Sequence, residues 1–193
     1  MTGMVLCGGQ SLRMGSDKGL LITEETHWAM AAVDKLSALK IPVKLSINFS
    51  QIDAYATAFP ELERVTDNNA LELKGPLLGL MSAHIACPSE DLFILACDMP
   101  RMETFLLKEL YQLADAATAD AYLFTNSGEP EPLCAIYTST ALTKIMAMIQ
   151  QKQLKKFAMK FVLDHLNVAT LALKDNQQPY FQNVNAHADL NGL

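Results

Sequence analysis

Apolar positions along the chain form short runs that alternate with longer periodic runs. The short runs predict strands at residues 4–7, 43–48 and 92–96. The runs 4–7 and 92–96 lack polar alternation, which is typical of parallel strands covered on both faces. The longer runs place apolar side chains three and four positions apart and predict helices at residues 28–39, 77–86 and 102–114. This alternation of strands and helices is typical of βαβ units.

The pattern changes beyond about residue 118. Residues 121–124 and 133–137 predict strands on either side of a turn at 126–130, and a strand is expected at 168–173. Between them, residues 140–165 predict a helical stretch that is broken near 150–155. The whole pattern predicts an α/β fold with three layers (α/β/α) around a mostly parallel, Rossmann-like sheet, and one domain over residues 1–193.

The charge and the cysteines of the chain exclude several classes of function. The net charge is -6 and the largest basic cluster is the pair Lys155 and Lys156, so we expect no nucleic-acid partner. No apolar run approaches the roughly 20 residues of a membrane span, and no secretion signal is recognisable, so we expect no membrane association. The four cysteines lack a CxxC spacing, which favours reduced thiols in a cytoplasmic protein.

A glycine-rich loop follows the first expected strand and carries the sequence CGGQSLRMGSDK. Gly8 and Gly9 allow the backbone to approach a ligand closely, while Arg13 and Lys18 supply two positive charges. Backbone N–H groups of such a loop bind phosphates, so these residues predict a polyphosphate site. The alternative is an ordinary turn between a strand and a helix, with both cations in solvent.

Asp98 and Asn48 follow other expected strands, at the edge of the sheet where α/β proteins bind ligands, and Asp67 follows Val65 and Thr66. Asp98 ends the run FILACD and offers the hard oxygen that Mg²⁺ requires, although it could instead cap the next helix. Asp67 precedes the segment GPLLGL, in which Pro76 is placed to open a helix, and this segment could be a helix start and nothing more. Asn48 follows the second strand, where an isolated asparagine is more often a turn residue.

A pair of asparagines near the C-terminus, Asn183 and Asn185, lies in the sequence QNVN. An Asx-type helix entry explains one of the two but gives no reason for the pair. Two weaker features are the segment 131–133 and the pair Lys155 and Lys156, both of which are more simply explained without a function.

These motifs together resemble those of the molybdenum-cofactor guanylyltransferases. The loop is similar to that family's LAGGxSxRMGxDK signature, with Cys7 in place of alanine. The other segments resemble its CDxP, GPLxGI and NVNTxxDL elements, the last with Ala186 in place of threonine. The loop at 24–27 departs from the family, which usually has a glycine, a basic residue and a proline there.

The resemblance implies transfer of GMP from GTP to molybdopterin, with release of pyrophosphate. It implies that Arg13, Lys18 and Asp98 are catalytic, that Asp98 is the magnesium ligand, and that Asn183 and Asn185 contact the acceptor. The nucleotide contacts that it implies are Leu6, Gly8, Gly9, Lys18, Asn48, Asp67 and Asp98. Proteins that insert the cofactor, or molybdoenzymes that accept it, are the implied partners. The alternatives are a related enzyme that uses CTP or another small phosphate acceptor, and a non-catalytic module that binds nucleotide or delivers cofactor.

Overall fold

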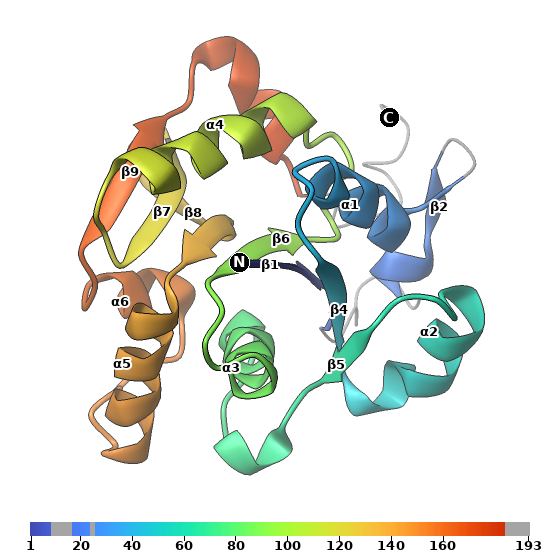
Figure 1. Ribbon diagram of the computed structural model, residues 1–193, viewed down its shortest axis with the longest axis horizontal. Coiled ribbons are helices and arrows are strands. Elements are labelled where there is room, and N and C mark those ends of the chain that lie inside the picture. The colour runs from blue at the N-terminus through green and yellow to red at the C-terminus, as the bar shows by residue number, and fades with distance from the viewer. Residues whose placement is uncertain (9–16, 24–25, 184–193) are drawn as a thin grey trace.

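A computed structural model describes residues 1–8, 17–23 and 26–183 of the chain. Within these residues, seven strands form one sheet in the order β5-β4-β1-β6-β8-β7-β9 (Figure 1). The strands of this sheet are β1 (Thr2–Leu6), β4 (Val43–Ile47), β5 (Arg64–Thr66), β6 (Leu92–Ala96), β7 (Ala121–Asn126), β8 (Glu129–Tyr137) and β9 (Val168–Ala172). A separate antiparallel pair joins β2 (Ile22–Thr23) to β3 (Thr26–His27).

Parallel pairing dominates the sheet. Strands β5, β4, β1 and β6 are neighbours and all parallel, and β9 is parallel to β7. Strand β8 is the exception, because it runs antiparallel to both β6 and β7. The predicted mostly parallel α/β sheet is confirmed.

Helices cover both faces of the sheet (Figure 1). On one face lie α1 (Trp28–Ser37), α2 (Ile52–Ala58) and α4 (Thr104–Ala116), and on the other lie α3 (Pro76–Ala86), α5 (Ser139–Gln150) and α6 (Met159–Leu163). Short 3₁₀ turns are η1 (Lys18–Leu20), η2 (Phe49–Gln51), η3 (Asn69–Leu71) and η4 (Asp175–Phe181). The three expected layers are therefore present, and the helical stretch after residue 138 is broken where it was predicted.

Alternation along the central strand separates two apolar cores. In β1, Met4 and Leu6 face the core beneath α3, α5 and α6, whereas Val5 faces the core beneath α1 and α4. Cys7 continues this alternation and packs with Val5. All four cysteines are buried free thiols. Helices of the described residues are all too short or too polar to cross a membrane.

The hairpin from β7 to β8 corrects one expectation. The strands continue to Asn126 and from Glu129, so the turn is confined to Ser127 and Gly128, both with positive φ. Residues 131–133 therefore lie in a strand and not in a turn. The pairing of β7 with β8 changes register between Leu123 and Thr125, which accommodates the prolines of β8 that cannot donate to the ladder.

Among the helices and strands, α2, β2, β3 and β5 had no counterpart in the sequence pattern. Each has between 2 and 7 residues, which is too short to carry a clear periodicity.

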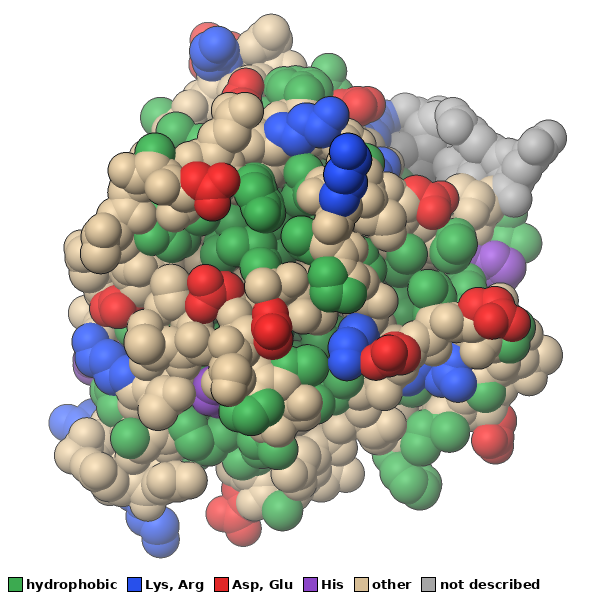
Figure 2. Space-filling view, in the orientation of Figure 1, with side chains coloured by type: hydrophobic (Ala, Val, Ile, Leu, Met, Phe, Trp, Pro, Cys, Tyr) green, Lys and Arg blue, Asp and Glu red, His purple; other side chains and the backbone are tan. Residues whose placement is uncertain are grey.

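Basic and acidic side chains are interspersed on the face that Figure 2 shows.

Helix α3 offers a direct test of the core. Leu80 is fully buried and Ile85, in the same helix, is 46% exposed. We expect Leu80→Ala to lower the free energy of unfolding by about 2–5 kcal/mol and Ile85→Ala to lower it by less than about 1 kcal/mol. Urea unfolding of both variants measures this, and equal losses would contradict the assignment of the core.

Candidate active site

A cavity of about 800 Å³ opens at the carboxyl ends of the four neighbouring parallel strands. Each of these strands places a polar or glycine residue there immediately or shortly after it ends. They are Gly8 after β1, Asn48 after β4, Asp67 after β5 and Asp98 after β6. This is the edge of an open α/β sheet at which ligands bind, so the cavity is the candidate active site.

Backbone hydrogen bonds beyond the strands fix the start of each loop. The Cys7 and Gly8 N–H groups both donate to the Ser46 carbonyl, at 2.9 and 3.1 Å. The Asp67 N–H donates to the Ile47 carbonyl at 2.8 Å, and the Cys97 N–H donates to the Leu6 carbonyl at 3.1 Å. The sheet ladder thus extends into the loops and holds the start of each loop beside the cavity.

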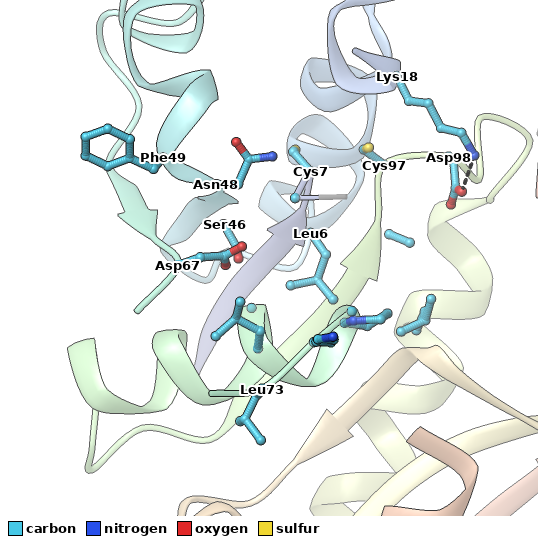
Figure 3. Close-up of a pocket in the computed structure, with 18 of the residues that line it drawn as sticks. Leu6, Cys7, Lys18, Ser46, Asn48, Phe49, Asp67, Leu73, Cys97 and Asp98 are labelled. Atoms are coloured by element: carbon cyan, nitrogen blue, oxygen red, sulfur yellow. Dashed lines mark hydrogen bonds and ion pairs between the residues drawn. The ribbon is translucent and has the colours of Figure 1, made fainter. Parts of the chain in front are cut away.

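One end of the cavity carries an ion pair (Figure 3). Lys18 Nζ lies 3.0 Å from Asp98 Oδ2, and the two side chains are 17% and 19% exposed. The other carboxylate oxygen, Asp98 Oδ1, is buried and has no hydrogen-bond partner within the part of the chain that the structure describes. A buried acceptor without a donor is costly unless a ligand satisfies it.

The opposite end of the cavity holds Asn48, Ser46 and Asp67, which lie together in Figure 3. Asp67 Oδ1 and Ser46 Oγ are buried and, among the described residues, have no hydrogen-bond partner. Burial raises the pKa of Asp67 from an ordinary value of 3.8 to about 6. The cavity therefore has a second unsatisfied carboxylate, well separated from the first by Leu6 and the sheet edge.

Two glycines allow this close packing. A Cβ at Gly79 of α3 would lie 2.9 Å from Ser46 Oγ, and a Cβ at Gly8 would lie 3.3 Å from Asp67 Oδ2. Gly79 inside a helix costs about 1 kcal/mol relative to alanine, and its contact with β4 explains why it is there. Gly75, with φ 65°, and Pro76 begin α3 as the sequence predicted and line the cavity.

The structure brings most of the expected site residues together. The cavity is lined by Leu6, Gly8, Lys18, Asn48, Asp67 and Asp98. Gly9, Arg13 and Asn185 lie outside the described residues. Asn183 is exposed and is not among the described residues that line the cavity.

Asp98 and Asn48 could each be explained without a ligand, as a helix cap and as a turn residue, and the structure supports only the second explanation. Asp98 does not cap the following helix, because α4 begins at Thr104 with Glu103 as its N-cap residue. Asn48 does cap a turn, since its side-chain oxygen accepts from the Ser50 N–H at 2.9 Å. Its amide nitrogen is not needed for that role, so Asn48 both shapes the loop and lines the cavity.

Sequence reasoning missed several lining residues, among them Ser46, Leu73 and Lys74, and it explained the segment 131–133, which includes the lining residue Leu133, without a function. Ser46 and Leu133 lie inside strands, where their side chains read as ordinary alternation. Lys74 directly precedes the Gly-Pro turn, and its positive charge was the one feature of the sequence that could have pointed to a missed lining residue.

The raised pKa of Asp67 makes the stability of the protein depend on pH. The folded state binds the proton of the Asp67 carboxyl group more tightly than the unfolded state does. The stability that this protonation contributes therefore falls as the pH rises from about 4 to about 6 and is constant above pH 6. Asp67→Asn removes the effect. We expect the melting temperature of Asp67→Asn, relative to wild type, to rise over this pH window, with the exposed Asp115→Asn as control. A difference that stays flat with pH would contradict the burial of Asp67.

Known proteins resemble this chain over its full length. A protein of Flavobacterium johnsoniae named probable molybdenum cofactor guanylyltransferase is 28% identical over 194 residues, covering 100% of this chain and 96% of the relative. A protein of Burkholderia vietnamiensis named molybdenum cofactor guanylyltransferase is 26% identical over 200 residues, covering 100% and 95%. The crystal structure of molybdopterin-guanine dinucleotide biosynthesis protein A from Archaeoglobus fulgidus superposes with a TM-score of 0.80 at 23% identity, covering 100% and 96%.

The family relationship rests on a match to a family model over most of the chain. Residues 3–166 match the family described as MobA-like NTP transferase domain. This span includes every described residue that lines the cavity. The chain therefore belongs to the MobA-like NTP transferases, and it is a nucleotidyltransferase.

Proposed function

We propose that this protein transfers GMP from GTP to the terminal phosphate of molybdopterin and releases pyrophosphate. The observation that carries the proposal is the cavity with two polar ends, one formed by Lys18 and Asp98 and the other by Asn48, Ser46 and Asp67. A nucleoside triphosphate has the same division, with a charged polyphosphate at one end and a hydrogen-bonding base at the other. The names of the relatives support molybdopterin as the acceptor.

We assign the polyphosphate to the end where Lys18 lies. Lys18 supplies a positive charge there, and Gly8 presents backbone at the start of the glycine-rich loop. Gly9 and Arg13 continue that loop in the sequence and complete the proposed phosphate contacts. Leu6 forms the apolar floor between the two ends.

We assign the base and ribose to the end with Asn48 and Asp67. The unpaired oxygen Asp67 Oδ1 is an acceptor, and guanine presents two adjacent N–H donors on its pairing edge. Cytosine offers a single donor group beside two acceptors, so an ionised carboxylate favours GTP over CTP. With a pKa of about 6, Asp67 is mostly ionised at neutral pH.

The residues at the phosphate end fit Mg²⁺. Asp98 Oδ1 is a buried hard oxygen without a partner among the described residues. No group of three or more His, Cys, Asp or Glu side chains that could hold a metal exists in the described ranges. A single carboxylate suits Mg²⁺ that takes its other ligands from phosphates and water. When bound there, Mg²⁺ supplies positive charge to the phosphate oxygens.

The chemistry requires positioning more than proton transfer. A phosphate oxygen of the acceptor attacks the α-phosphorus, a new P–O bond forms, and the bond to the leaving pyrophosphate breaks. The attacking oxygen is already anionic, so no general base is needed. Lys18 and Arg13 stabilise the negative charge that develops on the phosphates, and Asp98 holds Lys18 in place before the substrate binds.

We assign the contacts to the acceptor to Asn183 and Asn185, whose sequence motif resembles one that the family carries. We infer that cofactor-insertion proteins or molybdoenzymes receive the product. Four buried free thiols suit a reducing compartment, so we place the reaction in the cytoplasm.

The nucleotide specificity is testable by pyrophosphate release with GTP, CTP, ATP and UTP, each with molybdopterin as acceptor. We expect kcat/KM for GTP to exceed that for CTP at least tenfold, because only guanine offers paired donors to Asp67. Comparable or greater turnover with CTP would reject the guanylyltransferase assignment. Tight GTP binding with no turnover would favour the non-catalytic module instead.

The role of Asp98 is testable by substitution. We expect Asp98→Asn to lower kcat for GMP transfer by about 10²–10³-fold, since it weakens both the metal site and the position of Lys18. The melting temperature should change little because the side chain faces the cavity. Asp115→Asn, an exposed position on α4, serves as the control for loss of one negative charge. Near-normal transfer by a folded Asp98→Asn protein would remove Asp98 from the mechanism.

A further inference from the structure

Asp17, the residue immediately before Lys18, accepts three hydrogen bonds within the protein, and both of its carboxylate oxygens have a donor. Its Oδ1 accepts from the Tyr55 hydroxyl at 2.8 Å and from the Gly19 N–H at 3.0 Å. Its Oδ2 accepts from Gln51 Nε2 at 2.5 Å. Donors on both oxygens stabilise the ionised carboxylate and fix its orientation. Asp17 is therefore anchored, in contrast to the unsatisfied Asp98 and Asp67.

Gln51 connects this anchor to two strand ends. It is 6% exposed, and its Nε2 also donates to the Cys7 carbonyl at 3.0 Å, while its Oε1 accepts from the Asn48 N–H at 2.7 Å. Only one orientation of the amide satisfies all three partners, because the opposite one would place Oε1 against a carbonyl and a carboxylate. The end of β1, the loop after β4 and the end of the glycine-rich loop therefore meet at one buried side chain.

Tyr55 approaches the same point from α2. Its side chain is fully buried, and burial, with smaller contributions from nearby thiols and from Asp17, raises the pKa of its phenol far above the ordinary value. The hydroxyl is thus a permanent donor. A Cβ at Gly19 would clash with this hydroxyl. Gly19 is not among the described residues with positive φ, so the space taken by Tyr55 is the reason for glycine there.

The position of Lys18 depends on this arrangement. Its backbone lies between Asp17 and Gly19, both of which contact Tyr55 or its hydrogen-bond partner. From this anchored backbone its side chain extends to Asp98 at one end of the cavity (Figure 3). Neither Tyr55 nor Gln51 is among the described residues that line the cavity, so neither is placed to touch substrate.

We propose that Tyr55 and Gln51 are positioning residues for nucleotidyl transfer, which act through Asp17 to hold Lys18 against the phosphates. The inference rests on the proposed function for its catalytic consequence, but the restraint on Lys18 can be measured without turnover. Asp17 accepts three hydrogen bonds from the loop and from α2 and η2, whereas Asp98 Oδ1 has no partner among the described residues, so the Asp17 carboxylate serves the loop and Asp98 serves the ligand.

The test replaces Tyr55 by phenylalanine, which removes one hydrogen bond and leaves the ring in the core. We expect kcat for GMP transfer to fall about tenfold, by more than KM for GTP rises, because Lys18 acts on charge that develops in the transition state. The matched control is Tyr122→Phe, another buried tyrosine whose hydroxyl has two hydrogen bonds, to Ala117 and Ala119, remote from the cavity. We expect Tyr122→Phe to lower the free energy of unfolding by a similar amount and to leave kcat unchanged.

A second readout is the acetylation rate of Lys18 with an amine-reactive ester, measured by mass spectrometry in the absence of substrate, with exposed Lys108 as the internal reference. We expect the rate at Lys18 to rise at least threefold in Tyr55→Phe and in Gly19→Ala, which displaces the same hydroxyl, and to stay unchanged in Tyr122→Phe.

Three outcomes would overturn the inference. They are unchanged acetylation of Lys18 in Tyr55→Phe, a normal kcat despite faster acetylation, and an equal loss of kcat in Tyr122→Phe. An inactive wild type would reject the proposed function while leaving the acetylation result valid for the positioning of Lys18.

Discussion

Strand β1 is paired on both sides by parallel neighbours, and the functional geometry of the protein depends on this pairing. Because β4 and β6 are aligned with β1 in register, Ser46 and Ala96 lie beside Leu6 at the same edge of the sheet. The residues that follow these strands must then emerge together. The alignment also continues past the strand ends through main-chain hydrogen bonds, so the loops start from fixed points. A shift of one residue in either pairing would turn the side chains of the neighbouring strand away from the cavity.

The cavity is prepared for a ligand by polar atoms that the protein leaves unsatisfied. Asp98 Oδ1, Asp67 Oδ1 and Ser46 Oγ are buried without hydrogen-bond partners among the described residues. Each costs stability in the free protein, and a substrate that supplies donors or a cation recovers that cost on binding. Asp17 shows the contrast, since both oxygens of its carboxylate accept hydrogen bonds, from Tyr55, Gln51 and Gly19. Three carboxylates near one cavity thus differ in the partners that the protein gives them.

Cys7 is a departure from the family's loop signature that packing explains. Its thiol points to the core beneath α1, where it lies 3.7 Å from the Val5 carbonyl and is 6% exposed. The position requires a small side chain that tolerates burial, and cysteine meets that requirement as alanine does. Its contribution to the site comes from its backbone, whose carbonyl accepts from Gln51 and whose N–H pairs with β4.

The sequence by itself determined the class of fold and named several of the residues that line the cavity. Unbroken apolar runs predicted parallel strands such as β1 and β6, and Asp98 was singled out as the polar residue after one of them, because these patterns depend on local spacing alone. Only the tertiary structure decided that Ser46 and Leu133 line the cavity, that β8 runs antiparallel, and that Tyr55 anchors Asp17. These features join residues distant in the chain, and such contacts depend on strand order and helix placement, which leave no local trace in the sequence.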